Sequence, residues 1–302
     1  GLSQWPVAWT ILIRIVQATG HWDSPAPSVF WLLWVVAVAT MSVGNLLALM
    51  QTNVKRLLAY SGIAHSGYML VGVLVGPEGG SGLLGDGTAA VLYYIVIYGL
   101  ANLGAFAVLG LLRSRGRPCE TLRDIAGLLR RHPGLALLLA WAMLTLMGLP
   151  PTAGFWGKLS LFGSALAGVG TRLAPPAYHG WLIALVVIAL LNSALAAAYY
   201  LRVVAALLLH ENERPAEAIQ LEAPHVGAVL CGFLLLVFTF WPGLLLDPGR
   251  NATYQMRAAF PYRSAGAARQ GGDAPDGHAA AAAADREMSY RDPFATGAAL
   301  AP

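Results

Sequence analysis

Apolar stretches long enough to cross a lipid bilayer run through most of the first 245 residues of this 302-residue chain. The chain is 57% hydrophobic and only 11% charged, whereas a soluble domain carries about 25% charged residues. We therefore predict an all-α polytopic membrane protein with about seven transmembrane helices of about 20 residues each. The expected spans cover residues 2–17, 28–50, 57–76, 89–112, 135–168, 181–205 and 226–245.

The stretch 135–168 is too long for one straight crossing, since a helix over all of it would run about 50 Å. Pro150 and Pro151 interrupt it near the middle. Two arrangements are open: one broken, tilted pass, or two passes hinged at the prolines. We favour the broken pass, so that one of the predicted transmembrane helices is interrupted by Pro and Gly.

The loop charges indicate an orientation. The loop 113–131 carries six arginines against two acids, and residues 51–56 carry two more basic residues. The loop 77–88 has two acids and no basic residue. Basic loops face the cytoplasm, so the first two are expected inside and the third outside. One pass at 135–168 then places the loop 206–224 inside, and two passes place it outside.

The two ends of the chain differ from its middle. Residues beyond about 250 have no apolar period, so we expect a transmembrane domain over 1–249 and a disordered tail over 250–302. The chain opens inside an apolar run, with neither an initiating Met nor a basic region typical of a signal peptide. We expect it to be truncated or a fragment.

Several kinds of chemistry find no support in the sequence. There is no Gly-rich phosphate loop, no flavin or nicotinamide fingerprint, no CxxC and no His pair at haem or zinc spacing. Cys119 and Cys231 are far apart and are expected to be unpaired thiols. The formal charge of +4 lies in short loops and does not indicate nucleic acid. We expect no cofactor, no metal and no redox chemistry on this chain.

Lys158, one of only two lysines, lies within an apolar run just after the Pro-Pro break. An ammonium at that depth costs roughly 2.5–3.5 kcal/mol, and none of the 15 acids falls inside a predicted span. Lys158 must therefore be neutral part of the time, be hydrated, or pair with another chain or a missing segment. The broken helix offers free backbone groups to an ion, a proton carrier or water. We favour a role in proton transfer over a side chain that snorkels to an interface.

His65 lies in a polar stripe with Tyr60, Ser61 and Tyr68, most of which share one helix face. An imidazole takes and releases protons near neutral pH, so His65 is a candidate proton relay. The alternative is a histidine that hydrogen-bonds neighbouring helices for packing.

Other polar residues give weaker signals. Tyr94, Tyr98 and Asn102 follow one another at intervals of four and line either a hydrated passage, with Tyr98 as a relay candidate, or a helix contact. Lys55 is a further candidate, although a topology anchor is the favoured role. The segment 199–202, Tyr-Tyr-Leu-Arg, is expected to anchor its helix at the membrane interface.

Two motifs resemble those of a known family. Residues 45–68, NLLALMQTNVKRLLAYSGIAHSGY, and 148–158, GLPPTAGFWGK, are similar to the signatures of the antiporter-like membrane subunits of respiratory complex I. With lysine rather than glutamate at 158 and Tyr-Tyr-Leu-Arg at 199–202, the chain is most similar to the subunit N group of NADH-quinone oxidoreductase. The resemblance covers about residues 1–245.

The resemblance implies a fold of two inverted repeats, each with a broken helix and a half-channel, of which this chain holds the second repeat and flanking helices. By the same resemblance, Lys158 is the broken-helix lysine of the outward half-channel and His65 a relay on a central hydrated axis. The glutamate–lysine pair of the family's first repeat has no counterpart. A further family lysine falls near Trp5 when Arg14 aligns the segment, and an indole cannot relay a proton.

The function implied is that of a proton-translocating subunit of NADH:quinone oxidoreductase, a translocase of the bacterial inner membrane. Its partners would be the lipid bilayer and the other membrane subunits of complex I. NADH, FMN, iron–sulfur clusters and quinone would be bound by partner subunits. Two alternatives remain: a subunit of a Na+/H+ antiporter or membrane-bound hydrogenase of the same fold, and a truncated, non-conducting structural remnant.

Overall fold

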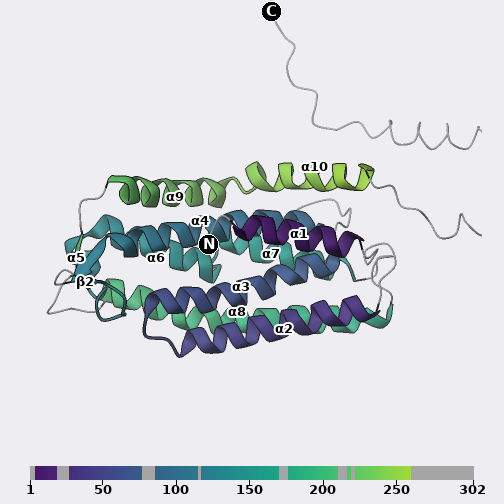
Figure 1. Ribbon diagram of the computed structural model, residues 1–302, viewed down its shortest axis with the longest axis horizontal. Coiled ribbons are helices and arrows are strands. Elements are labelled where there is room, and N and C mark those ends of the chain that lie inside the picture. Colours follow the sequence, from purple (N-terminus) through teal and green to yellow (C-terminus); the bar gives the residue numbers. More distant parts are fainter. Residues whose placement is uncertain are drawn as a thin grey trace, which may run out of the picture. The chain divides into compact units, whose positions relative to one another are not determined.

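The computed structural model describes residues 4–18, 27–76, 86–114, 117–169, 176–209, 216–218 and 222–259 (Figure 1). Each predicted apolar stretch contains helix. In chain order the helices are α1 (Gln4–Ala18), α2 (Pro27–Leu49), α3 (Val54–Val75), α4 (Gly87–Leu111), α5 (Leu128–Arg131), α6 (Pro133–Met147), α7 (Ala153–Ala167), α8 (Pro176–Leu209), α9 (Glu222–Phe240) and α10 (Gly243–Ala259).

Four of the described helices, α2, α3, α4 and α8, are long and apolar enough to cross a membrane. The pair α9 and α10, which bends by 77°, provides a fifth at most. Helices α1, α6 and α7 have 15 residues each, about 22 Å, which is short of a hydrocarbon core of about 30 Å. The predicted class is therefore confirmed, while the described helices give four or five candidate spans instead of about seven.

The predicted interruption of the 135–168 stretch lies between α6 and α7. Pro150 and Pro151 have no N–H to continue the α6 ladder, and Gly148 ends the helix in the left-handed region with φ of 81°. The two halves follow one another along the bundle (Figure 1), and both pack against α4 and α8. This end-to-end placement is the geometry of one interrupted helix.

A small antiparallel sheet, which the sequence did not predict, joins the loops at one end. Strand β1 (Leu112–Ser114) pairs with both β2 (Arg117–Pro118) and β3 (Glu217–Ala218). Asn53, in the loop after α2, forms an isolated antiparallel β-bridge with Thr121, in the loop after α4. The loop after α8 therefore lies at the same end as the loops that follow α2 and α4. A single broken pass predicts this arrangement, and two passes predict the opposite.

The C-terminal boundary differs from the prediction. Helix α10 continues to Ala259, so the start of the predicted tail is helical, and residues 260–302 lie outside the described part of the chain. At the other end, Trp5 belongs to α1, but its side chain is also outside the description.

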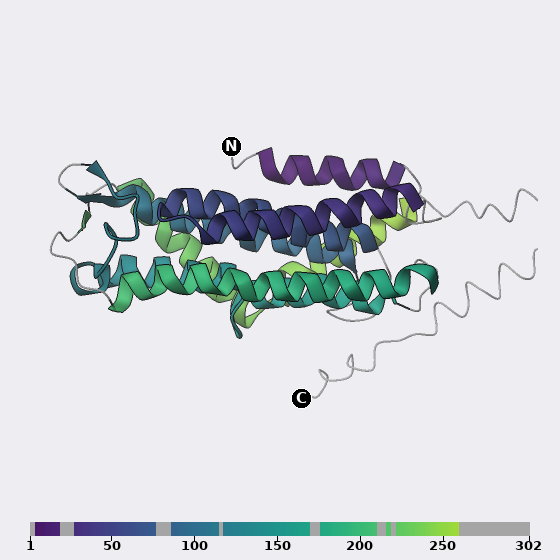
Figure 2. The same ribbon diagram turned by 90° about the horizontal axis from the view of Figure 1, so that it is seen from below.

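The helices pack most closely where small residues face one another. Helix α2 lies along both α3 and α8 (Figure 2). A Cβ on Gly67 of α3 would come within 2.7 Å of the backbone nitrogen of Met41 on α2, and a Cβ on Gly44 within 2.6 Å of the nitrogen of Ala64. Between membrane helices, where lipid is as apolar as the side chains, such close backbone approach replaces the hydrophobic driving force.

This packing predicts that Gly67→Ala forces α2 and α3 apart and lowers the free energy of unfolding by about 1–3 kcal/mol. Thermal unfolding of the purified protein in detergent measures the effect. Gly99→Ala on α4 is the control, because a Cβ there meets no atom within 4 Å. Equal unfolding temperatures for the two variants would contradict the close α2–α3 contact.

Candidate functional site

The side chain of Lys158 ends inside the helix bundle, with 5% of the residue exposed. Its Nζ donates to the carbonyl oxygen of Met147 at 2.7 Å and to Ser193 Oγ on α8 at 2.9 Å. In a continuous helix the Met147 carbonyl would accept from residue 151, which is a proline without an N–H. The break therefore supplies the acceptor that holds the lysine.

The surroundings of Lys158 separate it from an interface. A Cβ on Gly148 would lie 3.0 Å from Lys158 Cδ, so the glycine leaves the space that the lysine stem occupies. The ring of Tyr68 lies 5.1 Å from Nζ, within cation–π range. Among the described residues no carboxylate pairs with the ammonium. The side chain does not snorkel, and its charge is held by neutral oxygens and a ring.

His65 is likewise buried, at 1% exposure, between hydroxyl groups from two other helices. Its Nδ1 lies 2.7 Å from Tyr94 Oη on α4 and its Nε2 lies 3.0 Å from Tyr200 Oη on α8. Tyr98 packs beside the imidazole, with ring centroids 4.8 Å apart. A neutral imidazole has one N–H and one bare nitrogen, so one hydroxyl accepts from the ring while the other donates to it.

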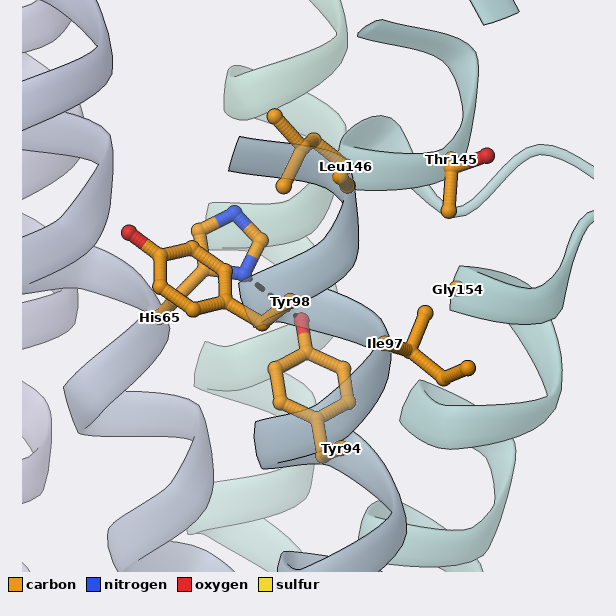
Figure 3. A pocket seen from close by; sticks show the side chains of 8 residues that line it. His65, Tyr94, Ile97, Tyr98, Thr145, Leu146 and Gly154 are labelled. Atoms are coloured by element: carbon orange, nitrogen blue, oxygen red, sulfur yellow. Dashed lines mark hydrogen bonds between the residues drawn. The ribbon is translucent and has the colours of Figure 1, made fainter. Parts of the chain in front are cut away.

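A small cavity opens beside this histidine, between α3, α4 and the two halves of the broken helix (Figure 3). Its lining combines His65 and the Tyr94 and Tyr98 rings with Thr145 and Gly154 at the ends of the break. The dashed contact in Figure 3 is the one between His65 and Tyr94. The expected relay candidate Tyr98 thus lies against His65 at the break, whereas Asn102 bonds to the Tyr98 carbonyl of its own helix.

Tyr68 stands between the two predicted relay residues. Its ring faces Lys158 Nζ, and the His65 ring lies 5.6 Å from it, centroid to centroid. The predicted residues Lys158, His65 and Tyr98 therefore belong to one buried polar region that α3, α4, α7 and α8 enclose.

Asn45 of α2 is the centre of a hydrogen-bond network that the sequence analysis did not identify. Its Nδ2 donates to Tyr68 Oη at 2.9 Å and to Asn192 Oδ1 at 3.1 Å, and its Oδ1 accepts from Tyr199 Oη at 2.9 Å. Asn192 and Tyr199 are seven residues apart, two turns along one face of α8. That spacing, and an Asn inside an apolar span, were the available signals.

The expected interfacial role of residues 199–202 is wrong for its two tyrosines. Tyr199 and Tyr200 are both 0% exposed, and their hydroxyls bond to Asn45 and His65. Arg202 instead donates from Nη2 to the Gln51 carbonyl at 2.6 Å, at the end of α2. Adjacent tyrosines near a helix end match an aromatic belt in sequence, but here both rings face the bundle.

Lys55 lies apart from the buried region. It is the second residue of α3, about 15 Å along the helix from His65, and its Nζ forms an exposed ion pair with Glu120 at 3.2 Å. Hydrogen bonds from Lys55 and Asn53 hold the pKa of the Glu120 carboxyl below its ordinary value. The structure thus places Lys55 at the loop end, where a topology anchor is expected.

The two cysteines are free thiols, as predicted. Cys119 is buried in the loop between α4 and α5, and burial raises its pKa to about 11. Within the described ranges, no three His, Cys, Asp or Glu side chains form a group that could hold a metal ion.

The network predicts that Asn45→Ala, which takes a hydrogen-bond partner from the buried side chains of Tyr68, Asn192 and Tyr199, lowers the free energy of unfolding by about 1–3 kcal/mol. Asn102→Ala is the matched control, because the Asn102 Nδ2 donates to the Tyr98 carbonyl of its own helix. Unfolding of the purified protein in detergent compares them. If Asn102→Ala lowered the free energy of unfolding as much as Asn45→Ala, the network around Asn45 would contribute no more to stability than a bond within one helix.

Comparison with known proteins agrees with this architecture. Residues 7–174 match the model of the family described as "NADH:quinone oxidoreductase/Mrp antiporter, TM". NADH-quinone oxidoreductase subunit N 2 of Roseiflexus castenholzii is 41% identical over 240 residues, which are 78% of this chain and 45% of that protein. Subunit N of Trichlorobacter lovleyi is 42% identical over 66% of this chain and 38% of its own length. The chain thus spans about half the length of these curated relatives or less.

Solved structures of the same kind share the fold. A chain of respiratory complex I from Thermus thermophilus is 36% identical, with a TM-score of 0.57 over 71% of this chain and 44% of that one. A chain of the Mrp complex from Dietzia sp. has a TM-score of 0.60 at 20% identity and shows the fold alone. On the match of the family model and of these relatives, the chain belongs to the NADH:quinone oxidoreductase/Mrp antiporter family of membrane subunits.

Proposed function

We propose that this chain is part of a proton-translocating subunit of an NADH:quinone oxidoreductase, and that protons pass through Lys158 and His65. The observation that supports this proposal most directly is the position of the Lys158 ammonium. It is buried, bonds to a carbonyl freed by the helix break, and has no carboxylate partner among the described residues. A charge held in this way is costly to keep, which favours release of its proton.

Proton release from Lys158 needs an acceptor close by. Ser193 Oγ and the Met147 carbonyl accept the bonds from Nζ, and water entering the break would take the proton itself. Loss of the proton leaves a neutral amine, which the apolar surroundings tolerate better than an ammonium. Return of a proton from the other side then restores the starting state.

His65 would pass a proton between two helices. A proton arriving at one ring nitrogen makes the imidazolium, and release from the other nitrogen restores the neutral ring in its second tautomer. Tyr94 Oη and Tyr200 Oη lie at the two nitrogens, so each hydroxyl can turn to match the new tautomer, and a flip of the ring then resets the relay for the next proton. Tyr98 lines the adjoining cavity and would help hold water there.

The broken helix is proposed to cross the membrane once, as α6 followed by α7, with the basic loops and the small sheet on the cytoplasmic side. The chain would hold the second inverted repeat of the fold together with its flanking helices. NADH, FMN, iron–sulfur clusters and quinone would be bound by partner subunits of the complex in a bacterial inner membrane. The redox energy would reach this chain through its contacts with those subunits.

Each of two other functions is supported by one specific observation. The matched family model, whose description also names the Mrp antiporter, fits an antiporter subunit, and neighbouring antiporter genes in place of dehydrogenase genes would support it. Trp5, where the resemblance implies a relay lysine, fits a subunit that conducts no protons.

The proposal predicts that Lys158→Ala in the assembled complex lowers the number of protons pumped per NADH oxidised, because it removes the ammonium that is bonded to the Met147 carbonyl at the break. Sealed vesicles measure proton uptake and NADH oxidation together, and a native gel checks assembly. The chain's other lysine supplies the control, since Lys55→Ala removes an exposed loop-end charge and should leave pumping unchanged. An assembled Lys158→Ala complex with native pumping would refute the proton path.

A further inference from the structure

The chain contains a second helix break, between α9 and α10, where Pro242 interrupts the ladder. The Phe238 carbonyl would accept from residue 242 in a continuous helix, but a proline has no N–H to give. Pro242 instead opens α10, and its carbonyl accepts from Leu246. Both the Phe238 and the Thr239 carbonyls at the end of α9 must therefore find partners outside their own helix.

Those partners come from the first break. Trp156 Nε1 on α7 donates to the Thr239 carbonyl at 3.2 Å. Tyr93 Oη on α4 lies 3.2 Å from the Ala153 carbonyl and 3.4 Å from the Phe238 carbonyl, so its one proton is shared between the two breaks. The carbonyl groups left free at the end of α9 thus accept hydrogen bonds from side chains that lie at the break between α6 and α7.

Thr239 also caps the start of α7. The N-cap residue Thr152 makes no side-chain capping bond, and its Oγ1 is buried without a hydrogen-bond partner. The Ala153 N–H is satisfied instead by Thr239 Oγ1 from α9, at 3.0 Å. The Thr239 hydroxyl donates its own proton to the Leu235 carbonyl at 2.7 Å, which leaves its lone pairs facing α7. We call Tyr93, Ala153, Trp156, Phe238 and Thr239 the Thr239 cluster.

The cluster lies close to Lys158 along a helix that has little room to move. Trp156 precedes Lys158 by two residues, and Ala153 precedes it by five. A methyl group on Gly154 would collide with the Thr145 carbonyl of α6, and one on Gly157 would come within 2.6 Å of the Tyr94 ring. The first turn of α7 thus packs tightly against α6 and α4 and is hydrogen-bonded to α9. The position of this turn determines whether Lys158 Nζ reaches the Met147 carbonyl.

We propose that Thr239 is a positioning residue for Lys158: its hydroxyl and carbonyl fix the start of α7 and so hold the lysine at the break. A movement of α9 would reach Lys158 through these bonds. Any effect of this positioning on proton transfer rests on the proposed function, whereas the positioning of Lys158 by Thr239 does not.

Reductive methylation of the assembled complex tests the positioning without any transport assay. The only lysines of this chain are Lys158 and Lys55, so the methylation rate of Lys158 divided by that of Lys55, read by peptide mass spectrometry with every variant at the same pH, corrects for the amount of reagent. Thr239→Val keeps the shape but loses the hydroxyl. We expect it to raise the ratio roughly 5- to 30-fold, the range for losing one buried hydrogen bond.

Three further variants make the outcome specific. Thr239→Ser keeps the hydroxyl and should keep the native ratio, and Trp156→Phe loses the indole donor and should raise it. Ser164→Ala should leave it native, because the Ser164 hydroxyl bonds to Leu161 within α7. If Thr239→Val does not assemble, Trp156→Phe, which keeps the ring packing, gives the result.

An unchanged ratio in Thr239→Val or Trp156→Phe would overturn the proposal, and so would an equal rise in Ser164→Ala. Pumping by Lys158→Ala, measured separately, bears on the proton path alone. A native ratio in these variants combined with lost pumping in Lys158→Ala would reject the positioning and keep the function. The reverse combination would keep the positioning and reject the function.

Discussion

The bond from the Lys158 ammonium to the Met147 carbonyl is the interaction on which the rest of this structure depends. A carbonyl without a partner in an apolar bundle costs several kcal/mol, and so does a buried ammonium without a counter-charge. Pro151 creates the first, and Lys158, seven residues later, satisfies it at 2.7 Å. Each group offsets the cost of the other only while α6 and α7 keep their places. The packing of α3, α4, α8 and α9 against the broken helix serves that requirement.

The remaining polar groups extend outward from this bond. Ser193 and the Tyr68 ring complete the surroundings of Nζ, and Tyr68 leads both to His65 and to the Asn45 network. These side chains come from helices far apart in the sequence, so the polar region exists only when the bundle is assembled. Such a region combines two properties that a proton path needs: groups that change protonation state, and hydroxyls that can turn without moving a helix.

The sequence predicted features that depend on one helix and missed those that depend on contacts between helices. The length of the apolar stretches located the long helices from α1 to α9 to within a few residues, and the Pro150-Pro151 pair located the break, because both effects act within one segment. Lys158 and His65 were singled out because an ionisable group in an apolar run is conspicuous, and both side chains lie in the buried polar region. Asn45, Ser193 and Thr239 were missed because a short polar residue in a membrane helix acquires meaning only from its partner. Tyr199 and Tyr200 were misplaced at the interface for the same reason, and the sheet joins loops that are distant along the chain.

The most direct test of the central claim is an experimental structure of this chain within the proposed complex, at a resolution that shows ordered water. We expect Lys158 Nζ within hydrogen-bond distance of the Met147 carbonyl, with water entering the break toward Tyr68 and His65. A carboxylate from another segment or subunit paired with Lys158, or a lysine side chain directed to the lipid, would contradict the account.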